Sequence, residues 1–121
     1  LVDRVHKVYT KGDIIFAQVP TMYAAREGIV KRVIAVEGET VTIDYEKNEV
    51  TVNGMVISEL YINLAESDPM LAETDETTAT YFVPDGCLFV MGDNRNHSAD
   101  SRSPEIGFIP KDNVIGKVRN P

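Results

Sequence analysis

Short apolar runs separated by turn residues make up most of the 121-residue chain. The runs are rich in the β-branched residues valine and isoleucine, and glycine, proline or asparagine stands between them, which is typical of strands joined by tight turns. No stretch keeps the spacing of an amphipathic helix over a useful length. The pattern predicts an all-β sheet or barrel-like fold with little helix, with strands at 1–8, 14–19, 29–36, 40–45, 49–52, 55–57, 81–83, 87–91 and 114–118.

Two connections between these strands carry a clear signal. Asn53 and Gly54 separate two strand-like runs, and Asn-Gly is the dipeptide most typical of a two-residue hairpin turn. Residues 66–76 hold five acidic residues, no basic residue, and a proline. The spaced ligands and central glycine of a calcium loop are missing there. We therefore expect a solvated acidic loop at about 63–80 rather than a cation site.

Size, charge and cysteine content narrow the class of protein. The length suits one hydrophobic core, so we expect a single domain over 1–121. A net charge of −7 argues against nucleic acid as a partner, because phosphate binding needs a basic face. A single cysteine, Cys87, forms no internal disulfide, and with His6 and His97 it makes no zinc site. We expect neither a metal nor a cofactor.

Lys31 and Arg32 interrupt the most apolar of the predicted strands. Because side chains alternate along a strand, the two cations point to opposite faces. Both faces are otherwise apolar, with Ile29, Val33 and Ala35 beside Lys31, and Val30, Ile34 and Val36 beside Arg32.

Two outcomes are physically sensible for such cations. A guanidinium stays charged and needs a carboxylate, for which Asp93 and Asp100 are available. An amine can lose its proton instead, because desolvation lowers the pKa of a lysine. A neutral lysine is a general base that can activate a hydroxyl nucleophile. The alternative is an edge strand whose lysine reaches water and prevents aggregation.

Residues 92–102, with the sequence GDNRNHSADSR, form the most polar segment between two apolar runs. Asp, Asn, Ser and Gly bond to nearby backbone and favour a compact loop. Asp100 and Arg102 stand two apart, so in an extended chain they share a face and can form a bidentate pair. Asp93 and Arg95 repeat that spacing. By composition alone, a polar surface turn is the simpler interpretation.

The two polar motifs together change that interpretation. The lysine strand at 29–34, followed by Gly-Asp-Asn-Arg-x-x-Ser-x-Asp-Ser-Arg at 92–102, resembles the bacterial type I signal peptidases, which use a serine–lysine dyad. The sequence Gly-Asp-Ile at 12–14 resembles the strand that precedes the lysine strand in that family, and 107–116 resembles its closing segment. Residues from about 40 to 80 carry no motif. The resemblance implies a twisted antiparallel β-sheet core.

The resemblance also implies a role for each matched residue. Lys31 takes the place of the general base, and Ser98 takes that of the hydroxyl that orients the lysine amine. Two ion pairs would stiffen the site, namely Arg32 with Asp93 and Arg102 with Asp100. Shallow apolar pockets for small side chains of an extended peptide would be formed by Ile14, Phe16, Ile29 and Val30.

The chain departs from the family pattern in two places. After the lysine strand the family has Gly-x-Pro-Gly-Asp, whereas residues 35–39 read AVEGE, a mild change in a turn. The nucleophile motif of the family, Ser-Met-x-Pro-Thr, is absent, and every serine of the chain follows Lys31. We therefore interpret the chain as a C-terminal catalytic-core fragment that begins after its nucleophile and is inactive by itself.

For the intact protein the resemblance implies a serine endopeptidase that removes signal peptides from secreted precursors. Its partners would be signal-peptide-bearing precursor proteins and the membrane, reached through a missing N-terminal anchor. It would act at the outer face of the bacterial cytoplasmic membrane. We expect the fragment itself to be soluble, because no apolar run approaches the roughly 20 residues of a membrane span.

Three alternatives stay open. A non-catalytic relative would bind secreted or pilus precursors during assembly, if the missing residue is not serine. A self-cleaving repressor would share a serine–lysine β-fold, although the polar loop at 92–102 favours the other two. A thiol hydrolase would pair Cys87 with His97, but a cysteine in an apolar strand is usually buried and inert.

Overall fold

The computed structural model describes residues 2–3, 8–19, 28–57, 70–72 and 76–118. Nearly all regular structure in these ranges is extended, so the predicted mainly β class with little helix is confirmed. The strands are β1 Val2–Asp3, β2 Ile14–Gln18, β3 Gly28–Val36, β4 Thr40–Asp44, β5 Glu49–Val52, β6 Met55–Val56, β7 Thr78–Phe82, β8 Cys87–Met91, β9 Ile109–Pro110 and β10 Val114–Val118. Two short 3₁₀ helices, η3 Arg95–His97 and η4 Lys111–Asn113, were not predicted.

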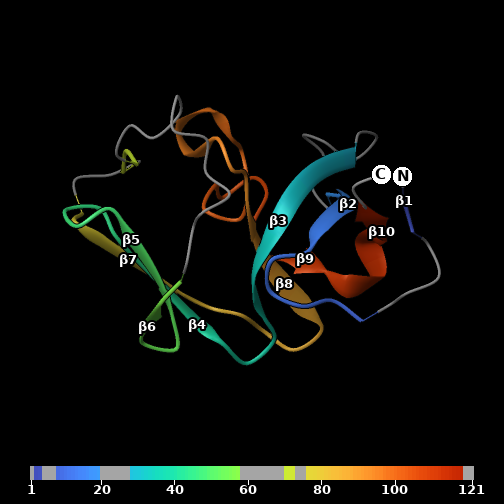
Figure 1. Cartoon of the computed structure of the whole chain (residues 1–121), viewed down its shortest axis with the longest axis horizontal. Helices are drawn as coiled ribbons and strands as arrows, with labels where there is room; N and C mark the ends of the chain where they lie inside the picture. The colour runs from blue at the N-terminus through green and yellow to red at the C-terminus, as the bar shows by residue number, and fades with distance from the viewer. Residues whose placement is uncertain (1, 4–7, 20–27, 58–69, 73–75, 119–121) are drawn as a thin grey trace.

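The strands form two antiparallel sheets that lie side by side (Figure 1). The larger sheet has the order β1-β10-β2-β3-β8-β9, and the smaller has the order β6-β5-β4-β7. The chain passes from β3 in the larger sheet to β4 in the smaller one, and returns from β7 to β8. In Figure 1 the segment after β8 rises between the two sheets. This segment is the polar loop at 92–102.

Strand β8 is the centre of the molecule, because it is buried on both faces. Leu88 and Val90 belong to a core on one side of the larger sheet. Phe89 and Met91 belong to a second core, which includes buried residues of β4 and β5. The ring of Phe89 lies 4.8 Å from that of Tyr81, measured between centroids. Each fully buried apolar side chain stabilises the fold by about 1.5–3 kcal/mol, so this strand fixes the position of whatever follows it.

A β-bulge in β3 corrects the predicted alternation. Val33 pairs with Val90, but the next pair is Ala35 with Phe89, so one residue of β3 is extra. The extra residue reverses which face the following side chains point to. Ala35 consequently lies in the second core with Ile34, instead of sharing a face with Lys31 as predicted. The pattern of apolar residues does not reveal a bulge, because both faces of this stretch are apolar.

The loops agree with the sequence in part. Asn53 and Gly54 have φ values of 51° and 82°, which is the hairpin turn that the dipeptide predicted. The acidic loop was predicted too long, since Thr78 already begins β7. Met70 is buried in the second core rather than solvated. Of the strand predicted at 1–8, the structure shows only Val2–Asp3, and residues 4–7, 20–27, 58–69 and 73–75 lie outside the described residues.

Candidate active site

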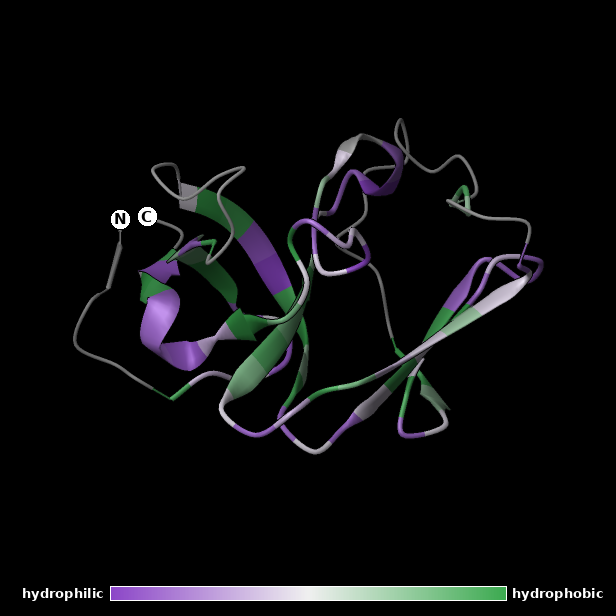
Figure 2. Ribbon diagram, turned by 180° about the vertical axis from the view of Figure 1, so that it is seen from behind, coloured by the Kyte–Doolittle hydropathy of each residue, from purple (hydrophilic) through white to green (hydrophobic). Residues whose placement is uncertain are grey.

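Lys31 lies at the point where β3 changes partners. It pairs with Ile15 of β2 on one side, while the pairing with β8 begins only at the next residue, Arg32. Figure 2 shows a hydrophilic band across the otherwise apolar strand β3. The Lys31 side chain is half-buried, and its Nζ donates a hydrogen bond of 2.7 Å to Ser98 Oγ. The structure thus joins the two motifs that the sequence places 67 residues apart.

Asp100 organises the other side of Ser98. The Ser98 hydroxyl donates to Asp100 Oδ2 at 3.0 Å, and the backbone N–H of Gly92 donates to the same oxygen at 3.0 Å. The Arg102 side chain donates to both carboxylate oxygens, at 2.8 Å from Nε and from Nη2. Because the Ser98 proton is directed at Asp100, a lone pair of Oγ faces the lysine amine. The serine is therefore held as an acceptor for Lys31.

The environment of Lys31 makes its amine easier to deprotonate. Burial lowers the pKa of the amine below the ordinary value of about 10.4. The charge of Asp100 raises this pKa again in part, and the charge of Arg102 lowers it further. Since the Asp100 carboxylate is shared with Arg102, it compensates only part of the desolvation. A lysine in this position is suited to accept a proton from a hydroxyl group.

Gly92 allows the close approach of Lys31 and Ser98. A Cβ atom at this position would lie 2.1 Å from Ser98 Oγ, 2.6 Å from Ser98 Cβ and 3.4 Å from Lys31 Nζ. The first two distances are far below van der Waals contact. Only glycine leaves room for the hydrogen bond between the amine and the hydroxyl.

The second predicted ion pair also forms in the structure. Arg32 donates to Asp93 from Nε at 2.9 Å and from Nη2 at 2.8 Å. Its Nη1 donates to the backbone carbonyl of Gly12 at 2.9 Å. The pair therefore ties the start of the polar loop to β3 and to the turn before β2, which explains why the Gly-Asp-Ile motif belongs to the site.

Sequence reasoning missed how residues 95 and 96 hold the loop. Asp93 pairs with Arg32, so the repeated Asp-x-Arg spacing at 93–95 does not make a local pair. Arg95 is instead buried, and it donates to the backbone carbonyl of Gly92 at 2.8 Å and contacts the sulfur of Met70 at 3.7 Å. Asn96 Oδ1 accepts the backbone N–H of Leu71 at 2.9 Å. A methionine after an acidic run gives little sign of such contacts.

The residues predicted to bind substrate lie on β2 and β3 but not on one face. Phe16 pairs with Val30, and Ile14 points to the same side as both. Ile29 points to the other side and packs against the first core. The aromatic ring of Phe16 covers Gly28, where an added Cβ would lie 1.9 Å from it. Val30 is 55% exposed, which leaves it open to a ligand. The role of this group in substrate binding stays a prediction.

Cys87 lies in an environment that disfavours a thiolate. Burial raises the pKa of the Cys87 thiol, and the charge of Glu37 raises it further, which is opposite to what a nucleophilic thiolate needs. The side chain of His97 lies outside the described part. Among the described residues, no group of three histidine, cysteine or acidic side chains is placed to hold a metal ion. Within the same ranges there is no helix with the length and apolar character to cross a membrane.

Comparison with known proteins agrees with this geometry. Residues 2–121 match the profile of the family described as "Signal peptidase, peptidase S26". The chain belongs to this family. The resemblance found in the two polar motifs is thereby confirmed, and the remaining strands match along with them.

Individual relatives are similar over most of the chain. Signal peptidase I of Mycobacterium tuberculosis is 42% identical over 107 residues, covering 75% of this chain and 35% of the relative. A probable signal peptidase I-1 of Synechocystis is 37% identical, covering 87% of this chain and 50% of the relative. The chain thus spans a third to a half of these relatives. The crystal structure of a signal peptidase I from Enterococcus faecalis has 31% identity and a TM-score of 0.70, covering 93% of this chain and 97% of that one.

Proposed function

We propose that this chain is the catalytic core of a serine endopeptidase that removes signal peptides from precursor proteins, with Lys31 as the general base. The hydrogen bond of 2.7 Å between Lys31 Nζ and Ser98 Oγ carries the proposal. It places an amine of lowered pKa beside a hydroxyl that is fixed as an acceptor. The family membership supports the same activity.

Ser98 acts as a positioning residue rather than as the nucleophile. Its hydroxyl donates a hydrogen bond to Asp100, and its oxygen already accepts a hydrogen bond from Lys31. The nucleophile in this proposal is a serine outside these 121 residues. Neutral Lys31 takes the hydroxyl proton of that serine as its oxygen attacks the peptide carbonyl, and then gives the proton to the leaving amine. Water, activated by Lys31 in turn, hydrolyses the acyl-enzyme and returns the serine hydroxyl.

The substrate in this proposal adds to β3 as a further strand. Among the described residues, only β2 pairs with residues 28–31, because β8 begins its pairing at Arg32. An extended peptide can therefore hydrogen-bond to the other side. Small side chains would contact Val30 and Phe16, and the scissile bond would lie at Lys31. Such a protein would work at the outer face of the cytoplasmic membrane, held by an anchor outside this chain.

Cleavage of a signal-peptide-like substrate by the full-length gene product in detergent tests the proposal. We expect Lys31→Ala to abolish cleavage, whereas Lys47→Ala, at an exposed position in the turn after β4, retains wild-type activity. Ser98→Ala should lower kcat and shift the pH at which the rate begins to rise, because the Lys31 amine loses the hydrogen bond that aligns it. Unfolding by urea, measured for each variant, separates these effects from loss of structure.

Two results would reject this assignment. Wild-type activity in Lys31→Ala would show that another group is the base. Binding of the precursor peptide without any cleavage by the full-length protein would favour the non-catalytic assembly role instead.

A further inference from the structure

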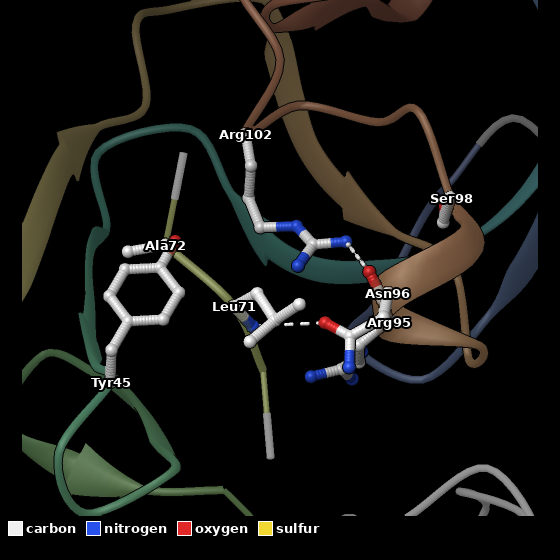
Figure 3. Close-up of a pocket in the computed structure, with 7 residues that line it drawn as sticks. All are labelled: Tyr45, Leu71, Ala72, Arg95, Asn96, Ser98 and Arg102. Atoms are coloured by element: carbon white, nitrogen blue, oxygen red, sulfur yellow. Dashed lines mark hydrogen bonds between the residues drawn. The ribbon is translucent and has the colours of Figure 1, made fainter. Parts of the chain in front are cut away.

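A cavity of about 200 Å³ opens between the polar loop and the smaller sheet, with Ser98 among its lining residues (Figure 3). Its described lining comes from three separate parts of the chain. These are the turn after β4, the short segment 70–72 and the loop after β8, which together contribute Tyr45, Leu71, Ala72, Arg95, Asn96, Ser98 and Arg102. Two of these residues are arginines, and none of the described lining residues is acidic.

Arg102 presents a hydrogen-bond donor to this cavity. Its Nε and Nη2 are used by Asp100, and Nη2 also donates to the backbone carbonyl of Arg95 at 2.7 Å. Nη1 has no partner among the described residues. Figure 3 shows the guanidinium group reaching across from one wall, between Tyr45 and Asn96 and above Leu71. The side chain is only 7% exposed, so its position is fixed by the contacts with Asp100.

The cavity begins one hydrogen bond away from the proposed base. Ser98 lines it, and Ser98 Oγ lies 2.7 Å from Lys31 Nζ. If the part of the substrate before the scissile bond pairs with residues 28–31, the part after it must continue past Lys31. The straight path is closed there, because Met91 of β8 pairs with Arg32 and occupies the position beside β3. A turn of the departing chain at Ser98 would lead it into the cavity, because Ser98 belongs to the cavity wall.

We propose that this cavity binds the first residues after the cleavage site and prefers an acidic side chain there. This inference rests on the proposed function and adds the specificity of its leaving-group side. A carboxylate is the group that a fixed guanidinium binds best, through charge-assisted hydrogen bonds. The amide of Asn96 forms a polar wall of the site, and the aromatic ring of Tyr45 forms an opposite, planar wall.

An adjoining cavity of about 260 Å³ provides an internal contrast. It shares Tyr45, Ala72 and Arg102 with the first cavity, but Glu76 also lines it. A second carboxylate beside Glu76 would meet a like charge. We therefore expect the acidic side chain of the substrate to bind in the first cavity, which Ser98 lines, and not in the adjoining cavity that Glu76 lines.

Leu71 offers a substitution that tests the site without touching the catalytic groups. Its side chain is 72% exposed at the rim, and its tie to Asn96 is through the backbone N–H. Leu71→Asp places a carboxylate at the rim, and Leu71→Asn has nearly the same shape without the charge. The substrates are fluorogenic peptides that share one signal-peptide-like sequence and carry Asp, Asn or Lys at one of the first three positions after the scissile bond.

For the full-length wild type, we expect kcat/KM to be about tenfold higher with Asp than with Lys at one of these positions, a ratio typical of one charged hydrogen bond. Leu71→Asp should remove or reverse this preference, and Leu71→Asn should retain it. Lys31→Ala, which should cleave none of the peptides, serves as the control for the chemistry.

The outcomes separate this inference from the proposed function. Equal kcat/KM for all peptides in an active wild type would overturn the acidic site and leave the peptidase assignment standing. A preference that Leu71→Asp does not change would also overturn it, since the discriminating charge would then lie elsewhere. Failure of the wild type to cleave any peptide would reject the proposed function and this inference with it.

Discussion

Two ion pairs with the same chemistry flank Lys31, but they differ in burial and in what they hold. Asp100 and Arg102 are 0% and 7% exposed, and the carboxylate of this pair directs the Ser98 proton. Arg32 and Asp93 are 15% and 35% exposed, and their pair connects backbone segments rather than reacting groups. The buried pair sets the protonation geometry of the site, whereas the outer pair holds the loop against the sheet. The same bidentate contact therefore has two different consequences.

The largest effect is expected from breaking the buried pair. Asp100→Asn leaves the Arg102 cation buried without its counter-charge, which costs about 3–5 kcal/mol of the free energy of unfolding. Urea unfolding measures this loss, and the double variant Asp100→Asn with Arg102→Met should recover part of it, because no uncompensated charge remains. A loss below about 1 kcal/mol would show that the pair is no more important to stability than an exposed one.

The second-largest effect is expected from a substitution that crowds the hydrogen bond between Lys31 and Ser98. Gly92→Ala would push Ser98 away from Lys31, and a displacement of about 1 Å at a reacting group can cost about 100-fold in rate. We expect kcat of the full-length protein to fall by that order. Gly28→Ala is the matched control, since its added Cβ would meet the Phe16 ring and should raise KM more than it lowers kcat. An unchanged kcat in Gly92→Ala would contradict the close approach.

The titration of Lys31 should have a smaller effect on the free energy of unfolding, and the sign of this effect can be predicted. Its pKa is lower in the folded protein than in the unfolded chain, mainly through burial, so the unfolded state binds more protons between the two values. The free energy of unfolding should therefore rise with pH through that window, up to about pH 10.4. Lys31→Met should lack this rise, and Lys47→Met should keep it. Parallel pH profiles for wild type and Lys31→Met would contradict a buried amine.

The outer pair should give the smallest effect. Asp93→Asn removes a carboxylate that is 35% exposed, and about 0–1 kcal/mol of stability is expected to be lost. Because Asp93 is the more exposed partner of this pair, added salt should diminish the difference between wild type and variant. Thermal unfolding at low and high ionic strength measures this. A loss as large as that of Asp100→Asn would remove the distinction between the two pairs.

The residue pattern along the chain predicts much of the fold and of the candidate site. The bounds of β8 and β10 agree with the apolar runs at 87–91 and 114–118, because a short run between turn residues has few other ways to be buried. Asn53 and Gly54 determine their hairpin locally. The family resemblance carried by the motifs at 29–34 and 92–102 implies which residues meet, and the structure brings together Lys31 with Ser98 and Arg32 with Asp93.

Only the tertiary structure decides the features that depend on packing between distant segments. The bulge at Val33 to Ala35 leaves no trace in a strand that is apolar on both faces. The burial of Met70 and the pairing of Asp93 with Arg32 rather than with Arg95 depend on which surfaces meet when the two sheets come together. The sequence by itself thus determined most of the strands and the residue types of the candidate site. Their packing determined which of two equal Asp-x-Arg spacings became a local ion pair and where the cavity beside Ser98 opens.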